Sequence, residues 1–439
     1  MDHWEDYESV GDKAMLLNAL RRLELHLGPC QFVGPLSPEK AGQFQYPGLT
    51  GVVPPHLEVT RQAGQLKGLY LTLIKFLPSR LTPKIKNTFF LDVAISSLAL
   101  KLFLYSIGLR FVFGKLFRNF LDEISTCDVF FTVGDCSLSD LWLDGVVLKA
   151  WLVKLVRPFV SVSVLSSQGI GPLETAWARK RLVGSFQSLD ILSFRDHSYS
   201  QALVEAEGLK GVPYQIVADE AFSFPVADQA EVWKALEAAG ASEAEPFIIV
   251  NFRNTDFTQS TSFLLNKIAS LLDSVIAATN KKMVFIPMSK GDHYGRDHAA
   301  GMSLKGMMKQ AERLCVLEPL DEVNLVKGII GAAAYSIGIS YHLHVFSLSQ
   351  GHPTLIVYTG DYYKTKSEGL ISFYGPPNRA VNFSEVSVEQ TLEYVLAMEN
   401  NYAEACAQVR KVNRGILENN DWTIKMLKSE LVEKGLLDR

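Results

Sequence analysis

The chain has 439 residues, a formal net charge of −4 and ordinary apolar and charged fractions, a composition typical of a globular protein with about two to three domains. This charge gives no electrostatic footprint for nucleic acid, so we expect no nucleic-acid partner. The five scattered cysteines fit a reducing compartment better than a disulfide framework. The acidic N-terminus does not have the pattern of a signal peptide, and we therefore expect a cytoplasmic protein.

The first helix is predicted from the apolar positions between Ala14 and Leu23, entered through a tight turn at Gly11 and Asp12. Residues 34–62 are rich in Pro and Gly, which favours loop with short extended pieces. A helical and apolar segment then runs from about 66 to 120.

The most hydrophobic stretch of the chain is residues 93–113, but Lys101 and Arg110 interrupt it. It therefore lacks the uncharged apolar run of a membrane span. Two interpretations stay open for residues 89–118. We favour a helix packed in a domain core; the alternative is a helix lying on a membrane surface, which would make the protein peripheral to a membrane.

Strands then alternate with helices in two series. Strands are predicted at 128–133, 159–165, 191–194 and 214–217 in the first series, and at 247–252, 283–287, 314–317, 335–339 and 354–358 in the second. Because helices separate the strands, we predict an α/β fold of two Rossmann-like parallel-sheet domains facing a cleft. The Ala- and Glu-rich stretch 226–246 marks the boundary, giving domains 1–225 and 226–439. The tail, about 387–437, is predicted to be helical and to pack back across both domains.

The stretch from Ser336 to Lys364, SIGISYHLHVFSLSQGHPTLIVYTGDYYK, indicates a binding site. Ser340 stands where a helix cap belongs after the strand 335–339, so His342 and His344 fall in the first turn of a helix. Free backbone N–H groups and the positive end of the helix dipole make an anion the natural ligand there. Two imidazoles can add hydrogen bonds, charge or a proton.

Other polar residues follow predicted strands. Gly134 and Asp135 form a turn after one strand, and Gln168 and Gly169 follow the next. Arg253 ends the first strand of the second series, a position suited to bidentate contact with phosphate or carboxylate. Close spacing of acidic and imidazole groups over 292–298 does not match an established ligand pattern, so we predict a solvated loop and no metal site there.

These motifs together resemble the polysaccharide pyruvyl transferase family. His342-Leu343-His344 is similar to the Arg-Leu-His signature of that family, with His342 in the place of arginine. The other matching segments are Val133–Ser137 with Ser139-Asp140, Gln168–Pro172, Arg195-Asp196, Asp219–Phe222, Asn251–Arg253, Ile286–Met288 with Asp292, and Tyr362–Lys366. The chain departs from the family at Val133, where glycine is usual, and at Glu220, where proline is usual. The apolar strand that precedes the Gly-Asp turn in the family has no counterpart in Met1–Tyr7.

The resemblance implies a B-type glycosyltransferase fold and transfer of pyruvate from phosphoenolpyruvate onto two hydroxyls of a saccharide, as a cyclic ketal, without a cofactor. The substrate-binding residues expected from it are Arg253, His342, Leu343, Lys364, Gly134, Asp135, Gln168 and Gly169. We expect His344 to be the catalytic acid, and Asp219 or Asp140 to take the hydroxyl proton. Two alternatives stay open: a nucleotide-sugar-dependent glycosyltransferase of the same architecture, and a non-catalytic glycan-binding protein. The oligomeric state is left open.

Overall fold

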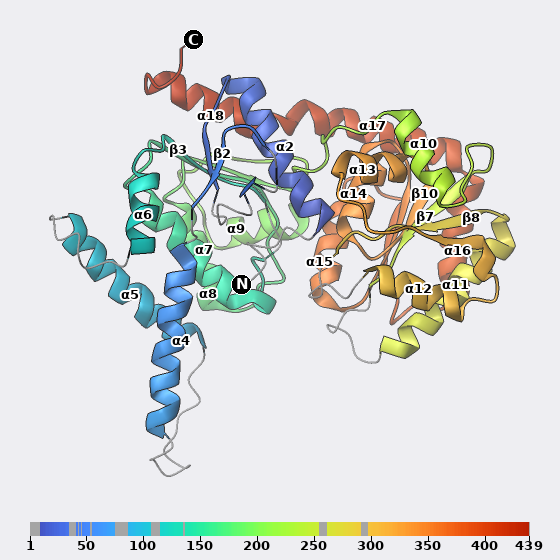
Figure 1. Cartoon of the computed structure of the whole chain (residues 1–439), viewed down its shortest axis with the longest axis horizontal. Helices are drawn as coiled ribbons and strands as arrows, with labels where there is room; N and C mark the ends of the chain where they lie inside the picture. Colours follow the sequence, from blue (N-terminus) through green and yellow to red (C-terminus); the bar gives the residue numbers. More distant parts are fainter. Residues whose placement is uncertain are drawn as a thin grey trace.

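A computed structural model describes residues 9–34, 41–42, 44, 46–52, 55–74, 87–106, 115–134, 137–253, 261–290 and 297–438, arranged in two lobes (Figure 1). The N-terminal lobe contains α2 (Val10–Leu27), β1 (Phe32–Gly34), β2 (Leu49–Gly51), α4 (Pro55–Ile74), α5 (Asn87–Ser106), α6 (Lys115–Ile124), β3 (Val129–Thr132), α7 (Leu143–Val156), β4 (Val162–Gln168), α8 (Ala176–Phe186), β5 (Ile191–Phe194), α9 (Ala202–Ala206) and β6 (Tyr214–Ile216).

The C-terminal lobe follows, and the chain ends in three helices. Its elements are α10 (Gln229–Ala238), β7 (Phe247–Asn251), α11 (Thr261–Thr279), β8 (Lys282–Phe285), α12 (Asp297–Met307), β9 (Leu314–Val316), α13 (Val323–Ala332), β10 (Tyr335–Gly338), α14 (Tyr341–Ser349), β11 (Thr354–Tyr358), α15 (Gly360–Ile371), β12 (Arg379–Asn382), α16 (Val388–Asn400), α17 (Tyr402–Asn420) and α18 (Trp422–Glu433).

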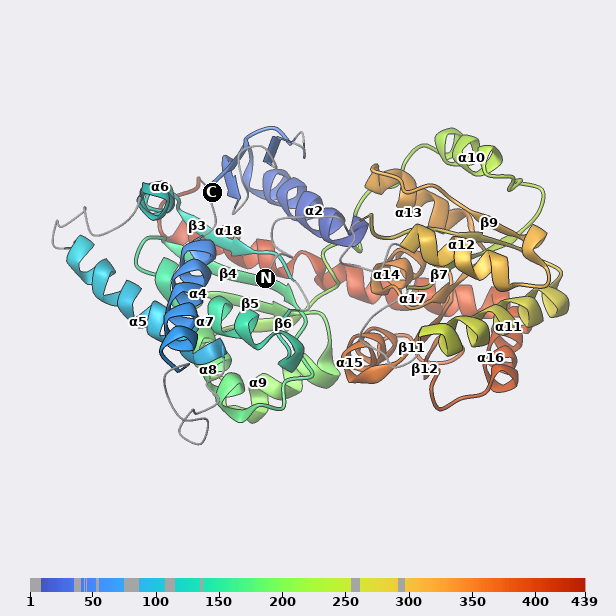
Figure 2. The same ribbon diagram turned by 60° about the horizontal axis from the view of Figure 1, so that its bottom comes forward.

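Each lobe is built on a parallel sheet, as the alternation of strands and helices predicts. The N-terminal sheet has the order β3-β4-β5-β6, and the C-terminal sheet has the order β12-β11-β10-β7-β8-β9. All pairings in both sheets are parallel. Strands β4, β7 and β11 are buried along their whole length, because helices cover both faces of each sheet (Figures 1 and 2).

The two lobes share one apolar core. Met15 of α2 and Phe222, which lies between β6 and α10, belong to the same buried cluster as Ile249 of β7 and Phe346 of α14. Apolar side chains of α2 and of the segment after β6 therefore continue into the core that covers β7 of the C-terminal sheet.

The C-terminal helices return to the N-terminal lobe, as the helical tail predicts (Figures 1 and 2). Ile424 and Leu427 of α18 are buried against Val162 and Val164 of β4 and Leu23 of α2. The expected boundary at 225/226 falls between β6 and α10, but the last helix covers a face of the N-terminal sheet.

The hydrophobic segment 89–118 forms α5 and the start of α6, while residues 107–114 lie outside the described part of the chain. Phe90 and Leu98 are buried in a cluster with Trp151 of α7, which is the core packing we favoured. On the outer face of α5, Phe89 is 51% exposed and Leu100 is 62% exposed. Within the described residues, every helix is too short or too polar to cross a membrane. Contact with a membrane surface stays a prediction.

Two elements of the C-terminal lobe were not predicted from the sequence. The residues around Lys364 form the helix α15, and residues 379–382 form the edge strand β12. The first helix starts at Val10, so Gly11 and Asp12 lie in its first turn. Residues 1–8 lie outside the described part of the chain, and Ser9 pairs with Ser289 of the C-terminal lobe in an isolated antiparallel bridge.

Candidate functional site

The carboxyl ends of β7 and β10 meet where the strand order of the C-terminal sheet reverses. The two strands are hydrogen-bonded neighbours, and Asn251 pairs in register with Gly338. Arg253 follows β7, and His342 lies in the first turn of α14, which follows β10. In doubly wound sheets the crevice at such a reversal is where ligands bind. The structure therefore brings together the arginine and the first histidine of the sequence prediction.

Arg253 is held by a buried carboxylate. Its Nε lies 3.1 Å from Oδ1 of Asp297, and the two side chains are 10% and 0% exposed. Asp297 also accepts hydrogen bonds from Nδ2 of Asn251 at 3.0 Å and from the backbone N–H of Met288 at 2.9 Å. The guanidinium is thus fixed at the end of β7 by a residue that starts α12.

The His342 ring lies between the two lobes. Its Nε2 is 3.8 Å from Oδ1 of Asp219 and, within the described residues, is buried without a hydrogen-bond partner. A Cβ atom built on Gly11 of α2 would lie 1.9 Å from its Nδ1, so only glycine allows α2 to approach this closely.

Burial lowers the pKa of His342 to about 4; the positive charges of Arg195, Lys366 and Arg253 act in the same direction, and Asp219 opposes them. The imidazole is therefore neutral near pH 7 in the empty protein. An anion bound among these cations would favour the protonated ring.

Asp219 is the counter-charge of the site. Its side chain is 2% exposed and accepts hydrogen bonds from Nη1 of Arg195 and, at 2.9 Å, from the backbone N–H of Ala221. The guanidinium of Arg195 lies 4.5 Å from the centroid of the Tyr341 ring. Arg195 and Asp219 thus form a buried ion pair of the N-terminal lobe that faces α14.

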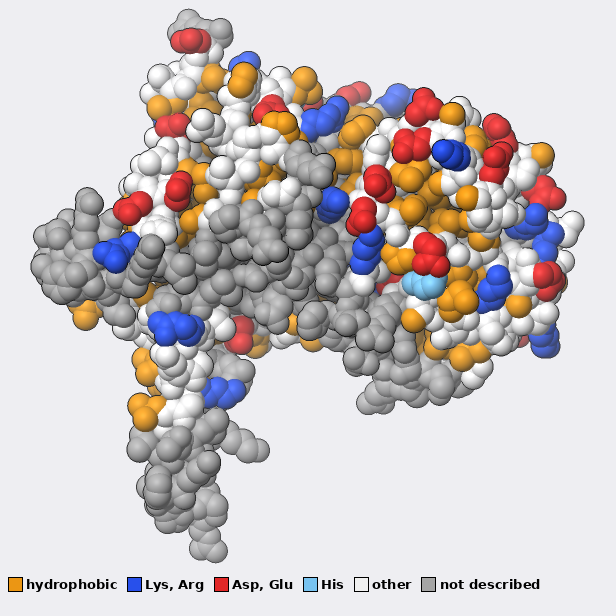
Figure 3. All heavy atoms as spheres, viewed as in Figure 1, with side chains coloured by type: hydrophobic (Ala, Val, Ile, Leu, Met, Phe, Trp, Pro, Cys, Tyr) orange, Lys and Arg blue, Asp and Glu red, His pale blue; other side chains and the backbone are white. Residues whose placement is uncertain are grey.

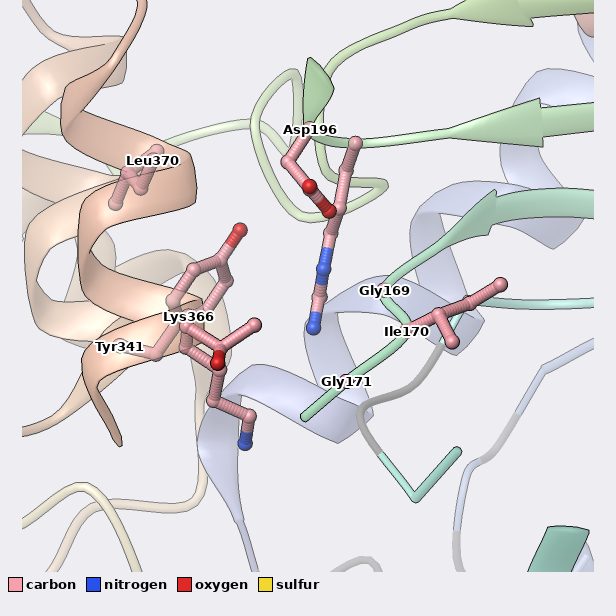
Figure 4. Close-up of a pocket in the computed structure, with 9 residues that line it drawn as sticks. Gly169, Ile170, Gly171, Asp196, Tyr341, Lys366 and Leu370 are labelled. Atoms are coloured by element: carbon pink, nitrogen blue, oxygen red, sulfur yellow. The ribbon is translucent and has the colours of Figure 1, made fainter. Parts of the chain in front are cut away.

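A small, partly open pocket lies beside this pair (Figure 4). Its lining comes from both lobes: Gly169, Ile170, Gly171, Arg195 and Asp196 on one side, and Tyr341, Thr365, Lys366 and Leu370 on the other. Figure 4 shows the labelled residues of α14 and α15 facing the 169–171 loop and Asp196. The pocket combines backbone polar groups, a hydroxyl, an aromatic ring and cations.

The lysine of the site is Lys366, not the predicted Lys364. Both lie on α15, but Lys364 is exposed to solvent, whereas Lys366 lines the pocket. Residues two apart on a helix point in very different directions, at about 100° per residue. Once the segment is helical, only one of the two lysines can face the cleft.

His344 and Leu343 lie in the core, and the structure does not support His344 as a catalytic acid. His344 is 0% exposed; its Nε2 lies 3.0 Å from the carbonyl oxygen of Gly338, and its Nδ1 lies 2.5 Å from Oγ1 of Thr354. Burial lowers its pKa to about 3. This neutral ring ties α14 to β10 and β11, and Leu343 is also 0% exposed.

Of the turn residues of the N-terminal lobe that were predicted to bind substrate, only one lines the pocket. Gly169 lines the pocket, but Gln168 is buried, and its Nε2 donates to the carbonyl oxygen of Val133 at 3.2 Å. A Cβ on Gly134 would lie 1.9 Å from the carbonyl oxygen of Ser167, so this glycine lets two loops pack. Asp135 lies outside the described residues.

Asp140, the other expected base, caps the chain before α8. Its carboxylate accepts from the backbone N–H of Glu174 at 2.6 Å and of Thr175 at 3.3 Å. This geometry does not support a role in proton transfer.

Glu220, where the family usually has proline, joins α2 to the segment between β6 and α10. It is 1% exposed, accepts from Nη1 of Arg22 at 2.5 Å and also accepts from the hydroxyl of Ser166. The departure is explained by this ion pair, which could not be found from the sequence because its partners are distant along the chain.

Of the acidic and imidazole groups of 292–298, Asp292 and His293 lie outside the described residues, and only Asp297 and His298 are placed. No group of three or more His, Cys, Asp or Glu side chains among the described residues is placed to hold a metal ion. Asp297 engages Arg253 instead, and His298 lies 3.5 Å from Glu318. The prediction of a solvated loop at Asp297 was wrong, because that residue is fully buried.

Two solved structures are similar in fold to this chain over nearly its whole length. A protein from Listeria monocytogenes described as a UDP-N-acetylglucosamine 2-epimerase has 11% identity and a TM-score of 0.52, covering 98% of this chain and 94% of its own. A trehalose-6-phosphate synthase has 11% identity and a TM-score of 0.50, covering 94% of this chain and 93% of its own. At this identity the likeness shows the fold alone, which is the B-type glycosyltransferase architecture.

A comparison with curated proteins gave no match. The sequence model of the family described as polysaccharide pyruvyl transferase matches residues 56–362, which include Arg253, His342 and most of both sheets. The matched range covers well over half of the chain. This chain belongs to the polysaccharide pyruvyl transferase family, which is a family of enzymes.

Proposed function

We propose that this protein transfers the pyruvyl group of phosphoenolpyruvate onto two hydroxyls of a saccharide acceptor, forming a cyclic ketal and releasing phosphate. The observation that carries the proposal is the meeting of Arg253 and His342 at the reversal point of the C-terminal sheet, opposite Asp219 of the N-terminal lobe. Family membership supports a saccharide acceptor.

The donor carries a phosphate and a carboxylate, and it needs several positive groups. Arg253 supplies a planar guanidinium suited to bidentate contact, and α14 begins at the same place with its N-terminal backbone groups. The positive charges of Arg253 and Lys366 both act on the ring of His342 and lower its pKa, which supports a shared anion site. The donor thus binds among Arg253, His342 and Lys366.

His342 is the proton carrier in this proposal, in place of His344. The bound dianion raises the pKa of the His342 ring, and Asp219, at 3.8 Å from Nε2, stabilises the imidazolium. The imidazolium protonates the methylene carbon of phosphoenolpyruvate, and the electron pair of its double bond forms the new C–H bond. The adjacent carbon becomes cationic.

The first sugar hydroxyl attacks this cationic carbon, and its proton passes to the neutral imidazole. The bond from that carbon to the phosphate oxygen then breaks, and phosphate leaves with the proton from His342. The second hydroxyl adds to the same carbon and returns a proton to the ring. Donor and diol are converted to ketal and phosphate, and the reaction needs no cofactor.

The saccharide enters from the side of the pocket beside Arg195. This pocket contains the Tyr341 ring and the Thr365 hydroxyl, together with the backbone of residues 169–171. Tyr341 precedes His342 in α14, and their rings are 5.3 Å apart. The pocket is too small to enclose a sugar, so it receives only a hydroxyl of the acceptor, next to the proton carrier.

The test is turnover with phosphoenolpyruvate and a panel of galactosyl and mannosyl acceptors. We expect phosphate release that depends on the acceptor, and an acceptor mass increased by one pyruvyl ketal. Arg253→Ala and His342→Ala should each reduce the rate by about a hundredfold or more. Arg157→Ala is the control. It removes the ion pair with Asp190, which precedes β5 at the amino end of the strand, and it should keep the wild-type rate.

A nucleotide-sugar transferase would give a different result. UDP-glucose in place of phosphoenolpyruvate should give no product in the same assay. Transfer from UDP-glucose, together with no phosphate release from phosphoenolpyruvate across the panel, would overturn the proposed reaction.

A further inference from the structure

We infer that Asp297 is a positioning residue for the donor site: it fixes the guanidinium of Arg253 in the orientation that an anionic ligand needs. The inference rests on the proposed function for the identity of that ligand. Asp297 touches neither the pocket nor His342 in the contacts described above, so it acts only through Arg253.

The first support is the burial of the pair. Asp297 is 0% exposed and the side chain of Arg253 is 10% exposed. Burying a carboxylate without a neighbouring positive charge is strongly unfavourable, because the ion loses its hydration. Arg253 supplies the charge that compensates Asp297, so the two side chains hold each other.

The second support is the direction of the contact. Asp297 lies 3.1 Å from Nε and 3.5 Å from Nη2 of Arg253, along one edge of the planar group. A guanidinium carries five N–H donors in a rigid fork. The charge contact at Nε and the hydrogen bond from Nη2 to Oδ2 lie along this one edge, which fixes the plane of the fork and with it the direction in which Nη1 points.

The third support is the anchoring of Asp297 itself. Its Oδ2 also accepts from Nδ2 of Asn251 on β7 and from the backbone N–H of Met288 after β8. The carboxylate is thus fixed to the ends of two neighbouring strands. Because Arg253 pairs with this carboxylate, the position of its guanidinium is fixed as well. A ligand-binding cation held by such a second contact loses less freedom when the ligand arrives.

The first arm of the test needs no ligand. In a ¹H–¹⁵N spectrum of the full-length protein, the Nε–H signal of Arg253 is identified by its loss in Arg253→Lys. We expect that signal to be sharp in the wild type, and to shift and broaden in Asp297→Asn because the guanidinium loses its fixed orientation. An unchanged Arg253 Nε–H signal in Asp297→Asn would overturn the inference.

The second arm measures phosphoenolpyruvate binding by calorimetry. We expect Asp297→Asn to weaken binding about tenfold, but to weaken it less than twofold when Arg253 is already lysine. Equal weakening in the two backgrounds would mean that Asp297 does not act through Arg253, and would also overturn the inference. Asp228→Asn is the matched control, because Asp228 also lies at a helix N-terminus, where it accepts from Ala230, but is exposed.

The two arms separate this inference from the proposed function. If the wild type binds no phosphoenolpyruvate while the Arg253 signal depends on Asp297, the donor is wrong and the positioning role stands. If the wild type binds the donor and the signal is indifferent to Asp297, the donor stands and the positioning role is wrong.

Discussion

His342 distinguishes this chain from the arginine of the family signature, and its surroundings explain how an imidazole can serve there. Gly11 admits the ring against α2, and Asp219 stands 3.8 Å from Nε2. Arginine is permanently charged, whereas burial lowers the pKa of His342 to about 4. Donor binding should therefore be coupled to uptake of a proton.

This coupling gives a prediction for pH dependence. A phosphate monoester is a dianion above its second pKa of about 6, so only the protein titrates between pH 7.5 and 9. Because the bound state favours the protonated ring and the free state does not, phosphoenolpyruvate affinity should fall by up to about tenfold per pH unit over this range. In His342→Arg the affinity should no longer fall with pH, because arginine stays charged over this range. Calorimetric titrations at four pH values measure the affinity of both proteins. A wild-type affinity that is flat with pH would contradict the coupling.

The two wrong assignments at this scale have one cause. His342 and His344, like Lys364 and Lys366, are two positions apart on a helix, and such residues lie on opposite sides of it. One member of each pair faces the cleft, while His344 faces the core and Lys364 faces solvent. The sequence shows the spacing, but tertiary packing decides which side is which.

At the scale of elements, the alternation of strands and helices was sufficient to predict most strands of both sheets. Strand β5 was predicted with its observed limits, and so was β11. Helix α15 has no apolar stripe, because its buried positions include Thr365, Ser367 and Gly369. Periodicity alone could therefore not separate it from a loop. The four-residue edge strand β12 was too short to be recognised.

The start of α2 is the element whose position matters most for the site. Its first backbone N–H donates to the carbonyl oxygen of Met288 at 3.0 Å, and Lys13 donates to the carbonyl oxygen of Asp321 at 3.1 Å. These bonds hold Gly11 against the His342 ring. The N-terminal helix is thus part of the wall of the C-terminal lobe's ligand site.

Gly11→Ala tests this wall. Alanine in a helix is normally more favourable than glycine by about 1 kcal/mol, but here its Cβ would lie 1.9 Å from Nδ1 of His342. We expect displacement of the ring and a loss of turnover of about tenfold or more. Gly184→Ala on α8 is the matched control, because a Cβ there meets no atom within 4 Å; it should raise Tm and keep turnover. Wild-type turnover in Gly11→Ala would contradict the close approach of Gly11 to the His342 ring.

A buried lysine fixes the segment between the two sheets. Nζ of Lys327 on α13 donates to the carbonyl oxygens of Phe222 at 2.6 Å and Phe224 at 2.8 Å. Burial lowers the pKa of Lys327 to about 7. Its ordinary value in an unfolded chain is about 10.4, so between these values the unfolded chain binds more protons than the folded one.

The free energy of unfolding should consequently rise with pH between about 7 and 9, by at most about 1.4 kcal/mol per pH unit from this group. Lys327→Met should remove that contribution, while losing the bonds to Phe222 and Phe224. Urea unfolding of both proteins at several pH values measures the difference. Parallel stability curves for wild type and Lys327→Met would contradict the lowered pKa.

For the whole molecule, the arrangement of the lobes determines whether the site exists. Arg253 and His342 belong to one lobe, whereas Asp219 and Arg195 lie on the other side of the cleft. On the face shown in Figure 3, acidic and basic side chains of the described residues are interspersed, without a field of one sign. The positive charges of Arg195, Lys366 and Arg253 instead act together on the buried ring of His342.

Glu368 of α15 connects the lobes with two tyrosines. Its Oε2 accepts from the hydroxyl of Tyr199, in the π-helical turn after β5, at 3.0 Å, and its Oε1 accepts from Tyr358 of β11 at 2.9 Å. The first bond crosses between the lobes, and the second stays within one. A hydrogen bond to a charged group contributes about 1.5–3 kcal/mol.

Tyr199→Phe should therefore increase hydrogen exchange in residues 197–206 by about tenfold or more. Tyr358→Phe is the matched control, since it removes a bond to the same carboxylate without touching the lobe interface. It should leave exchange in 197–206 unchanged. The same exchange pattern in both variants would show that the bond from Tyr199 does not hold the lobes together.

The most direct measurement is equilibrium binding of phosphoenolpyruvate to the full-length protein, with UDP-glucose titrated in parallel. We predict that phosphoenolpyruvate binds the wild type, that Arg253→Ala weakens this binding by about a hundredfold, and that UDP-glucose does not compete. Phosphoenolpyruvate binding that is unchanged in Arg253→Ala, or UDP-glucose binding in its place, would contradict the account.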